Sequence, residues 1–186
     1  MPITINGSGT LTGLSAGGLP DGSVTAADLA AGAGGKILQV VQSYKNDVFS
    51  TSTLTTWENI TGLSVSITPS ATSSKILVLV DVRLGFNGGQ LAQLRLRRGA
   101  TTVGSSTIGT TGNGFSFTDS DANSPSQTRV MATNTMTFLD SPSTTSSTTY
   151  QVQIWKDGSS TAYLNRRGLN LDHGACSSIT LLEVAG

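Results

Sequence analysis

The chain has 186 residues, enough for one domain with a sizeable core, and its 11 basic and 11 acidic residues give a net charge of zero. That balance argues against a protein that binds nucleic acid or an anionic membrane, because both partners require a basic surface. Charged residues make up only 12% of the chain, so hydroxyl groups supply much of the polar surface, which suits a protein that packs inside an assembly.

The first 34 residues are predicted to form an attachment arm with one short helix. Thr25 and Asp28 have capping-box spacing, Val24 and Leu29 fall at hydrophobic-staple positions, and Gly32 stands where the helix should end. A helix over residues 26–31 is too short to be stable alone, so we expect it to pack against another chain. The apolar residues predicted to make attachment and oligomer contacts are Ile3, Ile5, Leu19, Val24 and Leu29.

Residues 35–186 are predicted to form an all-β head. Apolar and polar residues alternate in GLSVSITP, QLAQLRLRRG and TTYQVQIWKD, while KILVLVDVRL is apolar on both faces, as in a central strand. Turn residues recur every 8 to 15 positions, which favours a β-sandwich or jelly roll of about eight to ten antiparallel strands. Asp157-Gly158 predicts a hairpin, and RVMATNTMTFLDSP predicts two short strands.

Residues 104–128 are predicted to be a long polar loop that forms the outward-facing recognition surface. Phe115 and Phe117 are expected to be exposed there, as anchors for sugars or proteins. Asp119 and Asp121 have a spacing that can bind calcium, although this pattern is more often a solvated loop.

Three arginines on one strand, Arg95, Arg97 and Arg98, form the main concentration of charge. Arg95 and Arg97 are two residues apart and therefore share a face, where their planar guanidinium groups suit a carboxylate, phosphate or sugar acid. The alternative is that this cluster forms a cross-strand or interchain ion pair with Asp81, Asp140 or Glu183. Four aromatic residues can stack on sugars, or instead pack in the core or an interface: Trp57, Trp155, Tyr44 and Tyr163.

The sequence contains no recognisable catalytic pattern. No strand–glycine loop–helix phosphate motif, G-x-S-x-G elbow or HExxH occurs. The single histidine, His173, and the single cysteine, Cys176, suggest a loop histidine and a small buried cysteine. A metal bound by His173 from three chains on a three-fold axis is the remaining alternative. We therefore expect no enzyme activity, no cofactor and no metal.

The segment GLPDGSVTAADLAAGAGGKILQVVQ resembles the junction in bacteriophage tail-fibre proteins where a short helix precedes the globular head. The blocks SSKILVLVDVRLG, LRLRRGATTVG, TFLDSPSTTSSTTYQVQIW and SSITLLEVAG resemble a β-rich domain found at the ends of phage fibre-like proteins. The resemblance spans about residues 19–186 and carries no catalytic signature.

The resemblance implies a trimeric virion protein with a compact β-sandwich head that binds a host surface. We therefore expect a homotrimeric short tail fibre or fibre head on the exterior of a phage particle. Its expected partners are other virion proteins of the tail, baseplate or capsid, and a host-surface glycan or protein. The alternative is a capsid decoration protein that stabilises the phage head. We expect no nucleic-acid partner and no membrane insertion.

Overall fold

A computed structural model describes residues 4–5, 11–12, 36–109, 113–120 and 127–186. The chain divides into two compact units, Met1–Lys36 and Ile37–Gly186. In the first unit, β1 (Thr4–Ile5) pairs antiparallel with β2 (Leu11–Thr12). The predicted helix over residues 26–31 lies outside the described residues.

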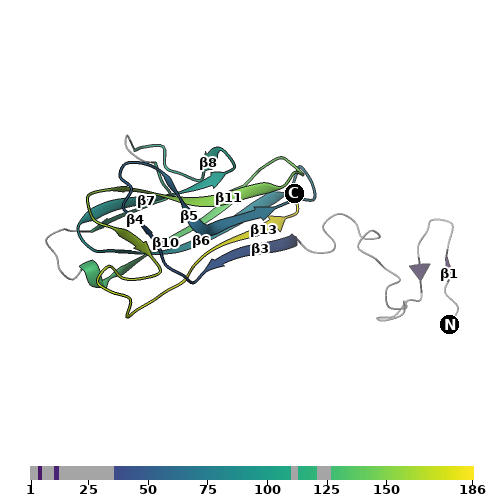
Figure 1. Cartoon of the computed structure of the whole chain (residues 1–186). Helices are drawn as coiled ribbons and strands as arrows, with labels where there is room; N and C mark the ends of the chain where they lie inside the picture. Colours follow the sequence, from purple (N-terminus) through teal and green to yellow (C-terminus); the bar gives the residue numbers. More distant parts are fainter. Residues whose placement is uncertain (1–3, 6–10, 13–35, 110–112, 121–126) are drawn as a thin grey trace. The chain divides into compact units, whose positions relative to one another are not determined.

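The second unit is a sandwich of two antiparallel sheets (Figure 1). The first sheet contains β3 (Ile37–Lys45), β4 (Phe49–Thr51), β6 (Lys75–Phe86), β10 (Met131–Asp140), β12 (Ala162–Leu164) and β13 (Ser177–Val184). The second sheet contains β5 (Glu58–Ile67), β7 (Gln90–Arg98), β8 (Thr101–Val103), β9 (Ser116–Ser120) and β11 (Thr148–Asp157). A 3-10 helix, η2 (Gln127–Arg129), precedes β10.

The strand order is that of a jelly roll. In the first sheet β3 pairs with β13, β13 with β6, and β6 with β10, while β12 and β4 continue the sheet beside the end of β6. In the second sheet β5 pairs with β11 and β11 with β7, whose other edge pairs with both β8 and β9. Successive strands mostly cross between the sheets, as in two interlocked Greek keys. The predicted all-β sandwich is confirmed.

One apolar core fills the space between the two sheets. Alternate residues of each central strand face inward, because side chains on a strand alternate between its two faces. The predicted inward positions Leu94 and Leu96 of β7 are fully buried, and so are Ile76 and Val78 of β6. The core also includes Leu63, Ile67, Val80, Leu84, Tyr150, Val152, Ile154, Leu164, Ile179 and Leu181.

Three local predictions are wrong. Asp157-Gly158 does form a turn, with Gly158 at φ 101°, but β12 then pairs with β4 and β6 in the other sheet and does not form a hairpin with β11. RVMATNTMTFLDSP forms one ten-residue strand, β10, because its whole length pairs with β6. Residues 116–120 of the predicted loop form β9, which pairs with the edge of β7.

Buried polar groups join the strands at both ends of the sandwich. Asp140 of β10 accepts hydrogen bonds from Arg98 of β7, at 2.7 Å, and from the Tyr150 hydroxyl of β11, at 2.6 Å. Asn165, at φ 63°, donates to the backbone carbonyls of Lys45 and Asp47 at 2.9 Å, so it holds the turn after β3 against the end of β12. Both networks cross between segments that are distant in sequence and fix their alignment.

Glu183 of β13 is a fully buried carboxylate with several hydrogen-bond donors. Its oxygens accept from the Gln39 amide at 2.5 Å and from the backbone and hydroxyl of Ser70 at 2.7 and 2.6 Å. Burial on its own raises the pKa of Glu183, but the hydrogen bonds from Gln39 and Ser70 outweigh burial and lower the pKa from 4.5 to about 2. The ionised carboxylate therefore stabilises the folded state.

Replacing Glu183 should lower the free energy of unfolding at neutral pH and make that free energy less dependent on pH in acid. The folded pKa lies below the unfolded one, so the stabilisation is complete above about pH 4.5 and is lost as the pH falls toward 2. We expect Glu183→Gln to lower the free energy of unfolding at pH 7 by about 1–3 kcal/mol and to flatten its decline below pH 4.5. Urea unfolding at pH 7, 5 and 3 measures both effects, with Asp157→Asn, at an exposed position, as the control. An unchanged acid profile would contradict this role.

Candidate binding face

The outer face of the second sheet brings together four residues that the sequence singled out, namely Arg95, Arg97, Phe117 and Trp155. Directly opposed residues on antiparallel strands share a face, so the strand register defines rows across the sheet. One row runs from Phe117 through Gln93 to Trp155. The next runs from Arg95 through Gln153 to Asn59. We call this outer surface of β5, β11, β7, β8 and β9, together with Trp57 and residues 104–109 and 113–114, the binding face.

Arg95 is held in place on this face by two side chains. Its guanidinium lies over the Trp57 ring, 4.2 Å from the ring centroid, in a cation–π contact. Its Nε donates to Oε1 of Gln153 at 2.7 Å, and the Gln153 amide donates in turn to Asn59 at 2.7 Å. This chain of contacts uses Nε, and the terminal nitrogens of the guanidinium form no hydrogen bond with another described residue.

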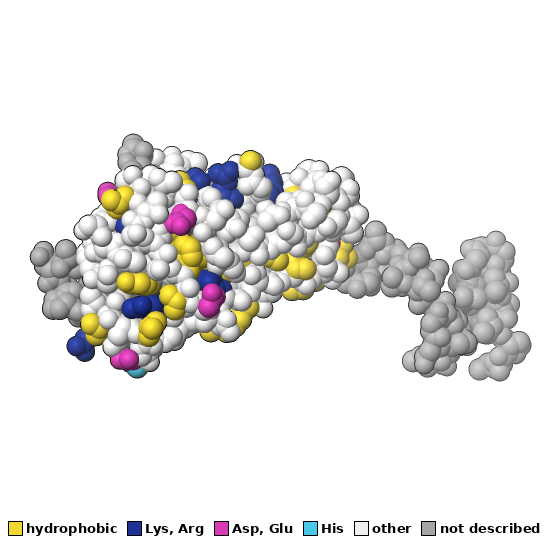
Figure 2. Space-filling model, viewed as in Figure 1, with side chains coloured by type: hydrophobic (Ala, Val, Ile, Leu, Met, Phe, Trp, Pro, Cys, Tyr) yellow, Lys and Arg dark blue, Asp and Glu magenta, His cyan; other side chains and the backbone are white. Residues whose placement is uncertain are grey.

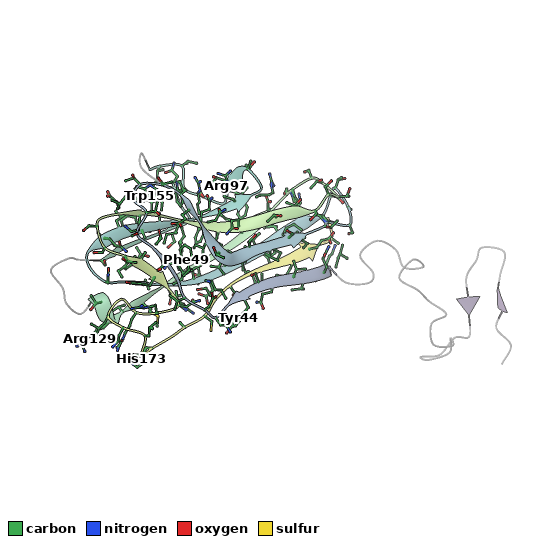
Figure 3. The ribbon with its side chains drawn as sticks, viewed as in Figure 1. Tyr44, Phe49, Arg97, Arg129, Trp155 and His173 are labelled. Carbon is green, nitrogen blue, oxygen red and sulfur yellow. The ribbon has the colours of Figure 1, made fainter. Side chains whose placement is uncertain are left out.

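Arg97 occupies the next row on the same face. It donates to the backbone carbonyl of Ala100, while its buried Nε has no hydrogen-bond partner among the described residues. Burial, followed by the charge of Arg97, lowers the pKa of Arg95. Figure 2 shows basic side chains gathered along the upper margin of the head, where Figure 3 labels Arg97.

Two adjacent hollows lie on the binding face. The first has a volume of about 480 Å³ and is lined by Trp57, Arg95, Asn113 and the small polar residues Thr102, Ser105, Ser106 and Thr107. The second, of about 390 Å³, is lined by Gln93, Phe117 and the segment that leads into β9. Ser106 and Asn113 line both hollows, which are therefore direct neighbours on this face. Their walls combine aromatic rings, amides, hydroxyls and an arginine.

The aromatic predictions have different outcomes. Phe117 is 58% exposed on β9, as expected, whereas Phe115 is partly buried against the core, because its backbone nitrogen donates to the Leu94 carbonyl at 2.7 Å and holds it close to β7. Trp57 is half-buried, and Trp155 is buried outside the core cluster, on the upper layer in Figure 3. Tyr44 is exposed on the other sheet, and Tyr163 stacks with Arg166 at 4.1 Å.

Of the ion pairs predicted for the arginine cluster, Arg98–Asp140 forms, whereas Arg95 and Arg97 form none with a described residue. Asp81 pairs with Arg83 at 2.9 Å and Asp140 with Arg98 at 2.7 Å. Glu183 is bound by the Gln39 amide and by Ser70. Each predicted carboxylate partner is therefore engaged by a closer group.

The remaining predicted site residues are spread over the chain. Asp119 is exposed on β9, opposite Leu91, and Asp121 lies outside the described residues. Ile5 ends β1, while Ile3, Leu19, Val24 and Leu29 also lie outside the described residues, so their attachment role stays a prediction.

The part of the chain that the structure describes holds no group of three or more His, Cys, Asp or Glu side chains that could bind a metal. Cys176 is exposed, not buried as predicted, and lies directly before β13. No helix among the described residues is long and apolar enough to cross a membrane.

Sequence patterns could not reveal the contacts that hold Arg95. Gln153 is 58 positions away, and only the pairing of β11 with β7 brings it beside Arg95. Trp57 and Asn113 reach the same hollow from separate connections. The alternation of apolar and polar residues along β7 was the one available signal. It showed that Arg95 lies on the outer face, but not which residues of other segments lie beside it.

Comparisons with known proteins give limited similarity. No family model matches the chain, and no curated protein matches it. The chain is similar to three solved structures of infectious bursal disease virus. The structure of the Gx strain is 12% identical, with a TM-score of 0.37, over 78% of this chain and 42% of that one. A mutant VP2 protein in T=1 particles is 14% identical, with a TM-score of 0.41, over 80% and 36%. The VP2 subviral particle is 14% identical, with a TM-score of 0.35, over 80% and 38%.

The chain thus spans about two fifths of the length of these viral proteins. At these identities and TM-scores the likeness does not decide the fold or the function.

The wall of the hollows depends on close contact at Gly114. A Cβ added there would lie 2.3 Å from the Leu94 carbonyl oxygen, so Gly114→Ala must lift this segment from β7 and weaken the Phe115–Leu94 hydrogen bond. We expect a loss of about 1–3 kcal/mol in the free energy of unfolding, measured by urea titration. Gly174→Ala is the control, because its Cβ would be 3.7 Å from the nearest atom. Equal losses in the two variants would contradict the close approach.

Proposed function

We propose that this chain is a virion structural protein, a trimeric short tail fibre or fibre head, that attaches a phage particle to a host-cell surface. The binding face is the contact with the host, and the arm joins the head to other virion proteins. The resemblance of the sequence to phage fibre proteins supports this assignment. Jelly rolls occur in viral capsid and lectin domains, but a fold alone does not decide a function, so the proposal rests on the site.

The observation that carries the proposal is the combination of side chains on the binding face. Phe117 is exposed on a strand and not in a mobile loop, so it offers an apolar surface at low entropic cost. The neighbouring hollows offer Arg95, Asn113 and several hydroxyls for directional hydrogen bonds. Aromatic surface beside convergent polar groups is typical of sites that recognise a ligand by shape and hydrogen bonding.

The outer face of the first sheet supports self-association. A row of directly opposed apolar residues crosses four strands from Val40 through Leu182 and Leu77 to Leu139. Val40 is 56% exposed and Leu139 is 55% exposed, and Figure 2 shows hydrophobic side chains along the lower right margin of the head. An exposed apolar patch on a neutral protein favours burial against a further copy, since no net charge opposes it.

Removing Phe117 should weaken host adsorption without unfolding the head. Labelled protein is screened on a panel of bacterial strains, and strains that bind it are tested with Phe117→Ala. We expect at least about a tenfold loss in affinity, because a central aromatic anchor often dominates a binding site. Tyr44→Ala is the matched control, since Tyr44 is an equally exposed aromatic, at 61%, on the opposite sheet.

Two outcomes of the adsorption experiment would contradict host attachment: no strain binds the unaltered protein, or Phe117→Ala binds as well as Tyr44→Ala. Antibody labelling of intact particles in the electron microscope gives an independent result. Label on the tail is expected, whereas label over the whole capsid surface would indicate a decoration protein.

The apolar row should control oligomeric state. Light scattering on the purified chain is expected to give about three times 19.1 kDa. Leu139→Lys should reduce this mass toward that of the monomer, because an interface that buries Leu139 would have to bury an unpaired charge. Thr133→Lys is the control, since Thr133 lies on the same strand and the same face but beside Arg83, away from the row. A monomeric unaltered chain, or a trimeric Leu139→Lys variant, would contradict this interface.

A further inference from the structure

We infer that the binding face recognises an acidic saccharide, with the sugar carboxylate bound by Arg95 and a neighbouring sugar unit packed against Phe117. This inference rests on the proposed attachment function and names the ligand class at the same site. It follows from the charge, the orientation and the surroundings of Arg95.

Arg95 and Arg97 lie on the binding face without an ion pair, and the carboxylates of that face, Asp119 and Asp157, lie two register rows away from Arg95, opposite Leu91. Three other arginines have acidic partners: Arg83 pairs with Asp81, Arg98 with Asp140 and Arg167 with Asp172. Arg95 and Arg97 share one face, and neither forms an ion pair with a described residue. Two adjacent positive charges repel each other, and each loses favourable hydration because it is partly removed from water. A bound anion offsets the repulsion and the loss of hydration.

The orientation of Arg95 favours a carboxylate. The Trp57 ring supports the plane of the guanidinium, and Gln153 takes the hydrogen of Nε. The terminal nitrogens remain as donors at the first hollow, which Arg95 lines. Because Trp57 and Gln153 already restrict the side chain, binding a ligand costs it little further rotamer entropy. A planar carboxylate can accept two parallel hydrogen bonds from such a fork, which is stronger and more directional than contact with a point charge.

The surroundings favour a sugar over other anions. The hollow beside Arg95 is lined by the hydroxyls of Ser105, Ser106 and Thr107 and by the Asn113 amide, which can exchange hydrogen bonds with sugar hydroxyls. A nucleic acid needs several cations spaced along its phosphates, and this neutral chain offers one arginine pair on this face. The second hollow, with exposed Phe117, adjoins the first through Ser106 and Asn113, so an oligosaccharide can extend over both.

The test compares acids with their neutral esters on the full chain. Isothermal titration calorimetry measures binding of trisaccharides that end in galacturonate, glucuronate or N-acetylneuraminate, each beside its own methyl ester. At least one acid is expected to bind ten or more times as tightly as its ester. Arg95→Gln should reduce that preference to less than threefold, and Arg95→Lys, which keeps the charge but loses the fork, should give an intermediate preference. Arg129→Gln is the control, because Arg129 is exposed at the end of η2.

Circular dichroism and urea unfolding of each variant show whether the head remains folded, and Arg95→Lys serves if Arg95→Gln does not fold. The inference is overturned if every ester binds as tightly as its acid, if none of the sugars binds, or if Arg95→Gln keeps the preference of the unaltered chain. In each case host attachment still stands if adsorption to cells depends on Phe117. Adsorption that does not depend on Phe117 contradicts the proposed function itself.

Discussion

The strict alternation of side chains on β7 is the constraint on which the rest of the structure depends. Leu94 and Leu96 must face inward to complete the core that the two sheets share, so Arg95 and Arg97 must lie on the outer surface. A shift of one residue in the pairing with β11 would place both arginines in an apolar interior, at a cost that the fold could not sustain. The stability of the sandwich therefore fixes the position of its most distinctive polar groups.

The periodicity of the strands predicted the class of fold, and the reason is physical. Each long strand has one buried face, so the alternation can be read along β5, β7 and β11 without knowledge of their partners. What the sequence could not show was which sheet a strand joins. Asp157-Gly158 has the residues of a hairpin turn, yet the chain leaves it for the other sheet, because the free edge of β6 is there to pair with β12.

The candidate site was predictable only in the part that is local in sequence. Arg95 and Arg97 share a face because they are two residues apart, and this needs no tertiary information. Neither forms an ion pair with a described residue, because Arg83 and Arg98 engage Asp81 and Asp140 instead. Asp81 and Arg83 are neighbours on one face of β6, whereas the Arg98–Asp140 pair joins the two sheets and needs the tertiary structure. Phe115 and Phe117 look equivalent in the sequence, but pairing of β9 with β7 begins between them, so Phe115 is partly buried against the core while Phe117 is exposed, although both line the second hollow.

The apolar row and the binding face lie on opposite outer surfaces of the same sandwich. Packed sheets are separated by about 10 Å, so each head is thin in this direction. Copies that associated through the first sheet would turn their second sheets away from the shared axis and toward the surroundings. Such an assembly would contact a surface with its sides and not with the end of its axis. Several weak contacts could form at the same time only where ligands are closely spaced and surround the assembly.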